Sequence, residues 1–324
     1  MKTTKISLSL AVLMVAGALA FSSCKKKEKT TPQDPDNEQT SASDNALAEN
    51  TSNDVLSMGS QVSENNSLST FRTANADDIM LASCATISSN AVGTVVATQY
   101  TIDFGPTATC TCNDGRVRTG KIFFDFTGSQ NGAKHYRNPG FKMTVTSSNY
   151  VVDGNQVSIT KTVTNTSPIA IATETAYSGT NLTWSIISNV SIIKVNNGGT
   201  ISWNCNRTKE LVNSSDPTCY SGQYNPIIWT KAVVKLNGSA NGTNNKGESY
   251  TALATNLIRD FNCAPLAPTH PHRHPFVSGT IDYTPGARAT RHIDYGSGQA
   301  YPAAPCDLLA TVTINGQTWS ITLP

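Results

Sequence analysis

Alternating apolar and polar positions along the C-terminal three quarters of the chain predict β-strands. Ile122, Phe124 and Phe126 would share one face of an extended segment, because successive side chains of a strand point to opposite faces. No stretch of this part shows helical spacing. We expect strands near 93–104, 116–127, 141–151, 156–165, 181–194, 199–206, 227–236, 248–257, 276–283, 289–295, 309–314 and 317–323.

Turn signals between these segments predict antiparallel neighbours. Asp153-Gly154, Asn237-Gly238 and Asn315-Gly316 supply the positive φ angles of tight hairpins, and Asn197-Gly198-Gly199 is of the same kind. Twelve or more strands exceed what one open, twisted sheet usually holds. We therefore expect an all-β fold, an antiparallel β-sandwich of long strands, with a barrel-like or two-subdomain β fold as the alternative.

The amino terminus has a different pattern, which is typical of exported proteins. Lys2 and Lys5 precede an apolar stretch, 7–21, that is too short for an ordinary membrane span. It ends at Phe21-Ser22-Ser23-Cys24, which resembles a lipobox apart from Phe21, where Leu is usual. We expect residues 1–23 to be a lipoprotein signal peptide and Cys24 to carry the acyl chains, such as palmitate, that hold the protein on a membrane.

The composition of the segment after Cys24 predicts a flexible tether. Residues 30–76 are rich in Ser, Thr, Asn and Asp and nearly free of aromatic residues, a composition that does not support a packed core. We expect a disordered tether over 24–80, with a marginal helix near 46–58 as the alternative, and a β-rich domain over 81–324. Because Lys25 follows Cys24 instead of Asp, we expect the outer membrane, on its periplasmic face or at the cell surface.

The predicted tether has a net negative charge and the predicted domain a net positive charge, but the domain's charge does not indicate binding to nucleic acid. Residues 25–80 contain 10 acidic and 5 basic side chains, and residues 81–324 contain 12 acidic and 17 basic ones. The basic residues of the domain are scattered, whereas binding of nucleic acid requires a dense stripe of cations along the phosphates. We expect no nucleic-acid partner.

Seven cysteines follow Cys24, and an oxidising envelope compartment favours disulfides among them. Cys205 with Cys219 would close a loop of about 15 residues. The other predicted pairs are Cys263 with Cys306, and Cys84 with either Cys110 or Cys112. The Cys-Thr-Cys spacing of 110–112 matches neither a redox motif nor half of a zinc site.

The clearest candidate for metal binding is the segment 269–275, in which His270, His272 and His274 alternate. Neutral imidazoles on one face of an extended chain could bind zinc or copper, but the surrounding prolines favour an ordinary surface loop. We therefore expect no metal and no cofactor.

No catalytic motif is found. There is no Gly-x-Ser-x-Gly elbow, and the Asp residues that could form a glycosidase pair are candidates by type alone: Asp103, Asp125, Asp282 and Asp294. The four tryptophans, at 184, 203, 229 and 319, could stack on sugar rings if exposed, although packing inside the fold is their commoner role.

Several segments resemble a family of uncharacterised lipoproteins from the Bacteroidetes. They include CATISS from Cys84, TIDFG from Thr101, GGTISW through Trp203, IDYG from Ile293 and ATVTING from Ala310. The resemblance implies a lipoprotein with an all-β domain and carries no activity. We expect a membrane-anchored binding or structural module of the cell envelope, with a glycan, lipid or protein ligand, and an envelope hydrolase acting on glycans as the alternative.

Overall fold

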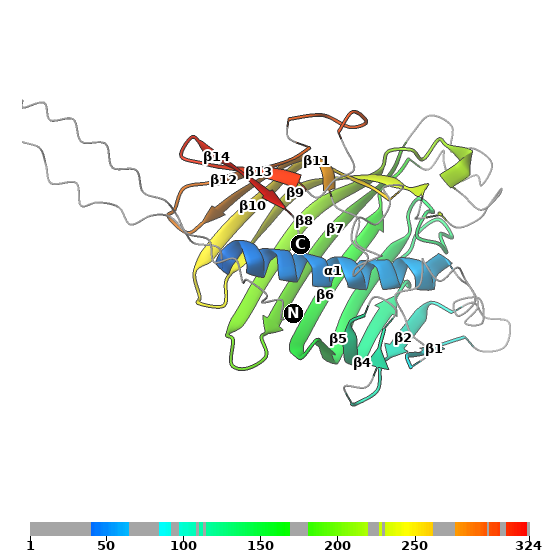
Figure 1. Cartoon of the computed structure of the whole chain (residues 1–324). Helices are drawn as coiled ribbons and strands as arrows, with labels where there is room; N and C mark the ends of the chain where they lie inside the picture. The colour runs from blue at the N-terminus through cyan, green and yellow to red at the C-terminus, as the bar shows by residue number, and fades with distance from the viewer. Residues whose placement is uncertain are drawn as a thin grey trace, which may run out of the picture. The chain divides into compact units, whose positions relative to one another are not determined.

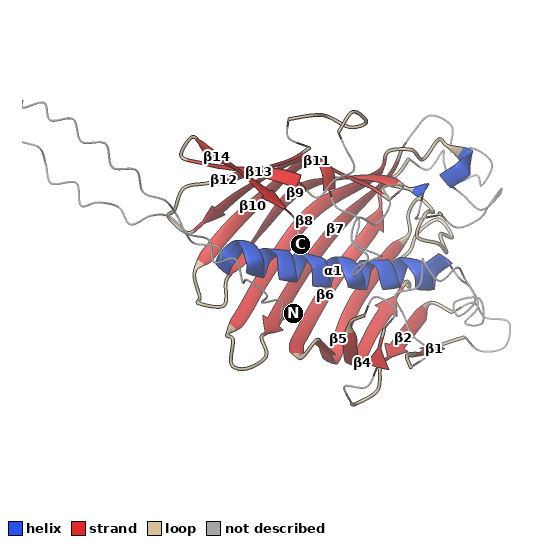
Figure 2. Ribbon diagram, in the orientation of Figure 1, coloured by secondary structure: helices blue, strands red, loops and turns tan. Residues whose placement is uncertain are grey.

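The structure is a computed structural model. It describes residues 40–64, 84–91, 97–107, 110–112, 115–168, 181–219, 227–228, 231–261, 276–296, 298–304 and 309–322. In these ranges one α-helix, α1 (Thr40–Glu64), accompanies a large antiparallel sheet (Figures 1 and 2).

The sheet is a meander in which consecutive strands pair antiparallel, with the short β3 against β4. This confirms the all-β prediction. The strands are β1 (Thr86–Ser89), β2 (Gln99–Asp103), β3 (Cys110–Thr111), β4 (Val117–Asp125), β5 (Lys142–Val152), β6 (Asn155–Asn165), β7 (Leu182–Ile193), β8 (Thr200–Leu211), β9 (Val233–Thr243), β10 (Ser249–Asp260), β11 (Phe276–Pro285), β12 (Arg291–Tyr295), β13 (Leu309–Ile314) and β14 (Gln317–Thr322). A 3-10 turn, Pro217–Cys219, follows β8.

The strands form one sheet, so the predicted division into a sandwich is wrong for the described residues. Figure 1 shows α1 crossing the strands on one side of the sheet, which we call the inner face. A sheet with one apolar face must bury it against another layer. Here that layer is a helix instead of a second sheet.

Helix α1 also corrects the predicted disordered tether over 24–80, because residues 40–64 belong to the packed domain. Its apolar side chains Ala48, Val55, Met58 and Val62 are at most 2% exposed. Gly59 allows close contact with β5, since a Cβ atom there would lie 2.4 Å from the Met143 sulfur. The helix therefore forms part of the hydrophobic core of the sheet.

Acidic side chains of α1 contact basic side chains of the inner face, or of residues next to its strands, along most of the helix. Buried charges of this kind are tolerated when they are paired and hydrogen-bonded. The pairs are Asp44 with Lys194 (2.9 Å), Glu49 with Arg207 (3.2 Å) and Asp54 with Arg118 (3.4 Å) and with Arg116.

Neutral polar groups of α1 are matched in the same way. The indole of Trp203 donates a hydrogen bond to Asn45 (2.9 Å), and the Lys161 ammonium donates one to the Ser52 carbonyl (2.7 Å). The Ser52 hydroxyl lies 3.1 Å from that of Ser188. These contacts satisfy polar groups that would otherwise oppose burial.

Three of the four predicted turns lie between strands, at 153–154, 197–199 and 315–316. The prediction of a turn at Asn237-Gly238 is wrong, because both residues lie within β9. Gly238 has a φ of 117°, and a Cβ atom there would lie 2.3 Å from the Asn206 carbonyl oxygen of β8. The glycine permits a close approach of two strands instead of a reversal of the chain.

Removal of α1 should prevent stable folding. Burial of Val55, Leu56, Met58 and Val62 contributes about 6–12 kcal/mol, which is comparable to the whole stability of an ordinary domain. A chain that starts at Leu81 should show no cooperative thermal unfolding by circular dichroism, whereas a chain that starts at Asn37 should. Equal transitions for both chains would contradict the role of α1.

Two lysines should make stability depend on pH. Burial lowers the pKa of Lys161 to about 8 and that of Lys209 to about 7, from an ordinary value of 10.5. The unfolded chain then binds more protons at neutral to mildly alkaline pH, so the free energy of unfolding should rise with pH between about 7 and 9. Urea titrations at several pH values should show the rise, and a Lys161→Met, Lys209→Met double variant should lose it.

The urea titrations are confined to pH values between about 7 and 9 because buried thiols lower the free energy of unfolding at higher pH. Burial raises the pKa of Cys205 and of Cys219 to about 11, from 9.0, so stability falls once the unfolded thiols ionise. A flat wild-type profile between about pH 7 and 9 would contradict the burial of the two ammonium groups.

Candidate binding groove

The sheet face opposite α1, which we call the outer face, carries mostly short polar side chains. Strand pairing places Ser239 of β9 opposite Leu253 of β10, which lies opposite Asp282 of β11. The next row along these strands is Asn241, Thr251 and Thr284. Residues paired in this way point to the same face.

These two rows line a shallow groove of about 500 Å³. Leu253, with 49% of its surface exposed, is the large apolar side chain within it. Ser239, its neighbour across β9, is much shorter than leucine, and this difference in length leaves a hollow beside Leu253. The lining residues are Ser239, Ala240, Asn241, Thr251, Ala252, Leu253, Asp282, Thr284 and Thr290.

Hydrogen bonds hold the polar side chains at one end of the groove. The Nδ1 atom of His292 lies 2.6 Å from a carboxylate oxygen of Asp282, which it faces across β11 and β12. The hydroxyl groups of Thr284 and Thr290 lie 2.8 Å apart. Both pairs are solvent-exposed, so their remaining donors and acceptors are accessible to a ligand.

The charge of the groove limits what it can bind. Asp282 is the one acidic or basic side chain among the lining residues, and a carboxylate repels phosphate and other anionic groups. A ligand that matches the groove is uncharged and rich in hydroxyl groups, with an apolar patch that can contact Leu253.

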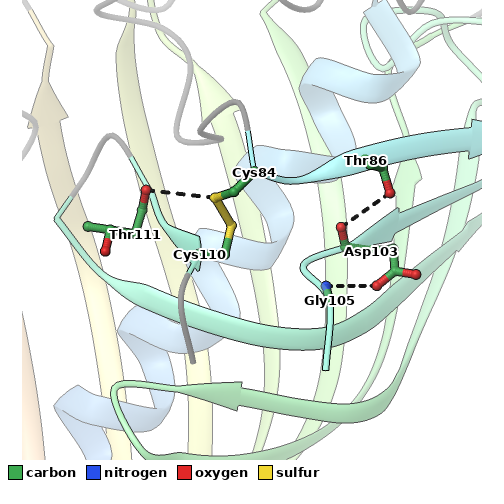
Figure 3. The surroundings of a disulfide bond; sticks show 6 residues. All are labelled: Cys84, Thr86, Asp103, Gly105, Cys110 and Thr111. Carbon is green, nitrogen blue, oxygen red and sulfur yellow. Dashed lines mark hydrogen bonds between the residues drawn. A yellow bond between two sulfur atoms is a disulfide. The ribbon is translucent and has the colours of Figure 1, made fainter. Parts of the chain in front are cut away.

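The predicted disulfides are confirmed in part. Cys84 is bonded to Cys110, one of its two predicted partners, and the bond links the segment before β1 to β3 (Figure 3). Cys112, Cys205 and Cys219 are buried thiols. The predicted pair Cys205–Cys219 is therefore wrong, because Cys205 points into the core from the middle of β8 and Cys219 lies in the 3-10 turn after that strand.

Other predicted sites lie outside the described residues. These include the lipidated Cys24, the pair Cys263–Cys306 and the candidate metal ligands His270, His272 and His274. Within the described ranges no cluster of His, Cys, Asp or Glu could hold a metal ion. None of the helices described is long and apolar enough to cross a membrane.

The candidate carboxylates act mainly as local hydrogen-bond acceptors. Asp103 accepts a hydrogen bond from the Gly105 amide (2.9 Å) and pairs with Lys121 (2.9 Å), and Figure 3 shows the first contact at the end of β2. The hydrogen bond from Lys121, followed by that from Gly105, holds the pKa of Asp103 below its usual range. Asp125 accepts hydrogen bonds from the amide and hydroxyl of Thr127.

The tryptophans do not gather on one exposed face. Trp184 and Trp203 are buried in the core, where Trp184 stacks on Tyr136 with ring centroids 4.7 Å apart. Trp319 is half exposed but lies across from Val312 and Ile293, on the opposite side of the sheet from His292. Trp229 is outside the described residues.

Sequence reasoning identified Asp282 as a candidate but missed the groove around it. The strands β10 and β11 were expected, but the strand expected over 227–236 ended before Ser239 and Asn241 of β9. The register was not predicted either, and register decides which side chains become neighbours. The signal present in the sequence was the alternation of Ser and Asn with Ala in 239–241, and of Tyr and Ala with Thr and Leu in 250–253.

Comparison with known proteins adds no relative: no protein family, no curated protein and no solved structure matches the chain significantly. The resemblance to Bacteroidetes lipoproteins therefore stays a prediction.

Proposed function

We propose that this protein is a lipid-anchored module of the cell envelope that binds a neutral glycan in the groove of β9, β10 and β11. The observation that carries the proposal is the exposed Leu253 among short hydroxyl and amide side chains. Sugar rings present apolar C–H faces bordered by hydroxyl groups, and this groove offers a complementary surface to both.

The anchor is the second part of the proposal, and its support is the lipobox-like sequence ending at Cys24. Two or three acyl chains hold a protein at a bilayer durably. The proposed location is the outer membrane, with the domain on its periplasmic face or at the cell surface.

Anchoring can be tested with Cys24→Ser. We expect the variant to lose incorporation of labelled palmitate and to leave the membrane fraction, because no other residue would carry the acyl chains. A Ser23→Gly variant, which keeps a small residue before the cysteine, should behave as the parent chain does. Retention of Cys24→Ser in washed membranes would contradict a lipid anchor.

Glycan binding can be tested by affinity electrophoresis of the chain 25–324 in gels that contain neutral polysaccharides such as mannan, xylan or β-glucan. We expect retardation by at least one of them. Leu253→Asp should weaken it at least tenfold, equivalent to about 1.4 kcal/mol, because it replaces the apolar side chain that contacts the sugar ring with a hydrated carboxylate.

Leu309→Asp is the matched control, since Leu309 is also exposed (48%) but lies on β13, outside the groove lining. Equal losses in the two variants, or retardation by anionic polysaccharides alone, would overturn the proposed site.

The hydrolase alternative requires two carboxylates beside a cleft, whereas Asp282 is the single carboxylate of this lining. Release of new reducing ends from a retained polysaccharide would favour the hydrolase.

A further inference from the structure

Strand β14 forms one edge of the sheet. In the described part of the chain its single strand neighbour is β13, to which the Asn315-Gly316 turn connects it. An edge strand exposes a row of backbone donors and acceptors that can pair with another chain.

The register of the β13–β14 hairpin identifies these groups. Ile314 and Gln317 flank the two-residue turn and form its closing hydrogen-bonded pair. Because such pairs alternate along an antiparallel ladder, Trp319 and Ile321 also bond to β13. The N–H and C=O groups of Thr318, Ser320 and Thr322 then point to the free edge.

This edge lacks the features that usually prevent association. Residues 309–322 contain no charged side chain and no proline, and β13 and β14 pair without a bulge. Trp319 at the edge is half exposed. Natural sheets protect a free edge with charges, prolines or bulges, so an unprotected one indicates a partner.

We propose that two copies of this chain pair through β14, antiparallel, with Ser320 opposite Ser320 of the partner subunit. In this register Thr318 faces Thr322 of the partner subunit, so all three outward-facing residues form hydrogen bonds. Trp319 faces Ile321 of the partner subunit on the inner face, which joins the two apolar rows. The uncharged hairpins bring no like charges together.

The symmetry of this dimer suits a tethered protein. The twofold axis is perpendicular to the sheet, so both α1 helices lie on one side of the joined sheet and both outer faces on the other. Seven strand spacings separate β11 from β11 of the partner subunit, which places the two grooves roughly 30 Å apart. One extended polymer could then occupy both grooves.

The dimer can be tested by sedimentation velocity and light scattering of the chain 25–324. We expect twice the monomer mass. Ser320→Pro removes the central outward N–H without touching the bonds to β13, so the dissociation constant should rise at least tenfold. Ser320→Thr keeps the N–H and should remain dimeric, and circular dichroism should show that both variants fold.

Cross-linking fixes the register independently of these variants. Ser320→Cys should form an intersubunit disulfide under mild oxidation, whereas Thr318→Cys, which faces Thr322 of the partner subunit, should not link to itself. A monomeric parent chain, a dimer unaffected by Ser320→Pro, or an open series of oligomers from pairing of β14 with β1 would each overturn the proposal. If Ser320→Pro does not fold, the cross-linking result decides.

Discussion

The whole structure depends on how the inner face of one long sheet is covered. A meander of this size has a continuous apolar face, and α1 is the layer packed against it. The helix is not strongly apolar, so its position depends on the pairing of Asp44, Glu49 and Asp54 with cations of the sheet. Such pairs contribute little net stability compared with apolar contacts, but separating one of them would leave a buried charge without its partner.

This arrangement divides the roles of the two faces. Because α1 and the side chains beneath it cover the inner face, the outer face of β9, β10 and β11 is open to a ligand, and its chemistry is set by Ser, Thr and Asn around Leu253. The predicted disordered tether over 24–80 is wrong for residues 40–64, which belong to the domain.

The strands could be predicted well because their signals are local: period-two alternation and the turns at 153–154 and 315–316. The helix could not, because its buried Ser, Asn and Asp residues imitate a disordered composition. Several of them find partners more than 100 residues away, as Ser52 does in Lys161 and Ser188. The groove was missed for a related reason, since it depends on strand register, and Gly238 lies within a strand although Asn-Gly usually marks a turn.

Hydrogen–deuterium exchange of the chain 25–324 tests the central claim most directly. If α1 is part of the core, the amides of Ala48 to Val62 should exchange as slowly as those in the middle of β6, β7 and β8. The hydrogen bonds of the helix and of these strands would then break only when the whole domain unfolds. Exchange of these amides within seconds, while the strands stay protected, would show that the helix is not the layer that covers the sheet.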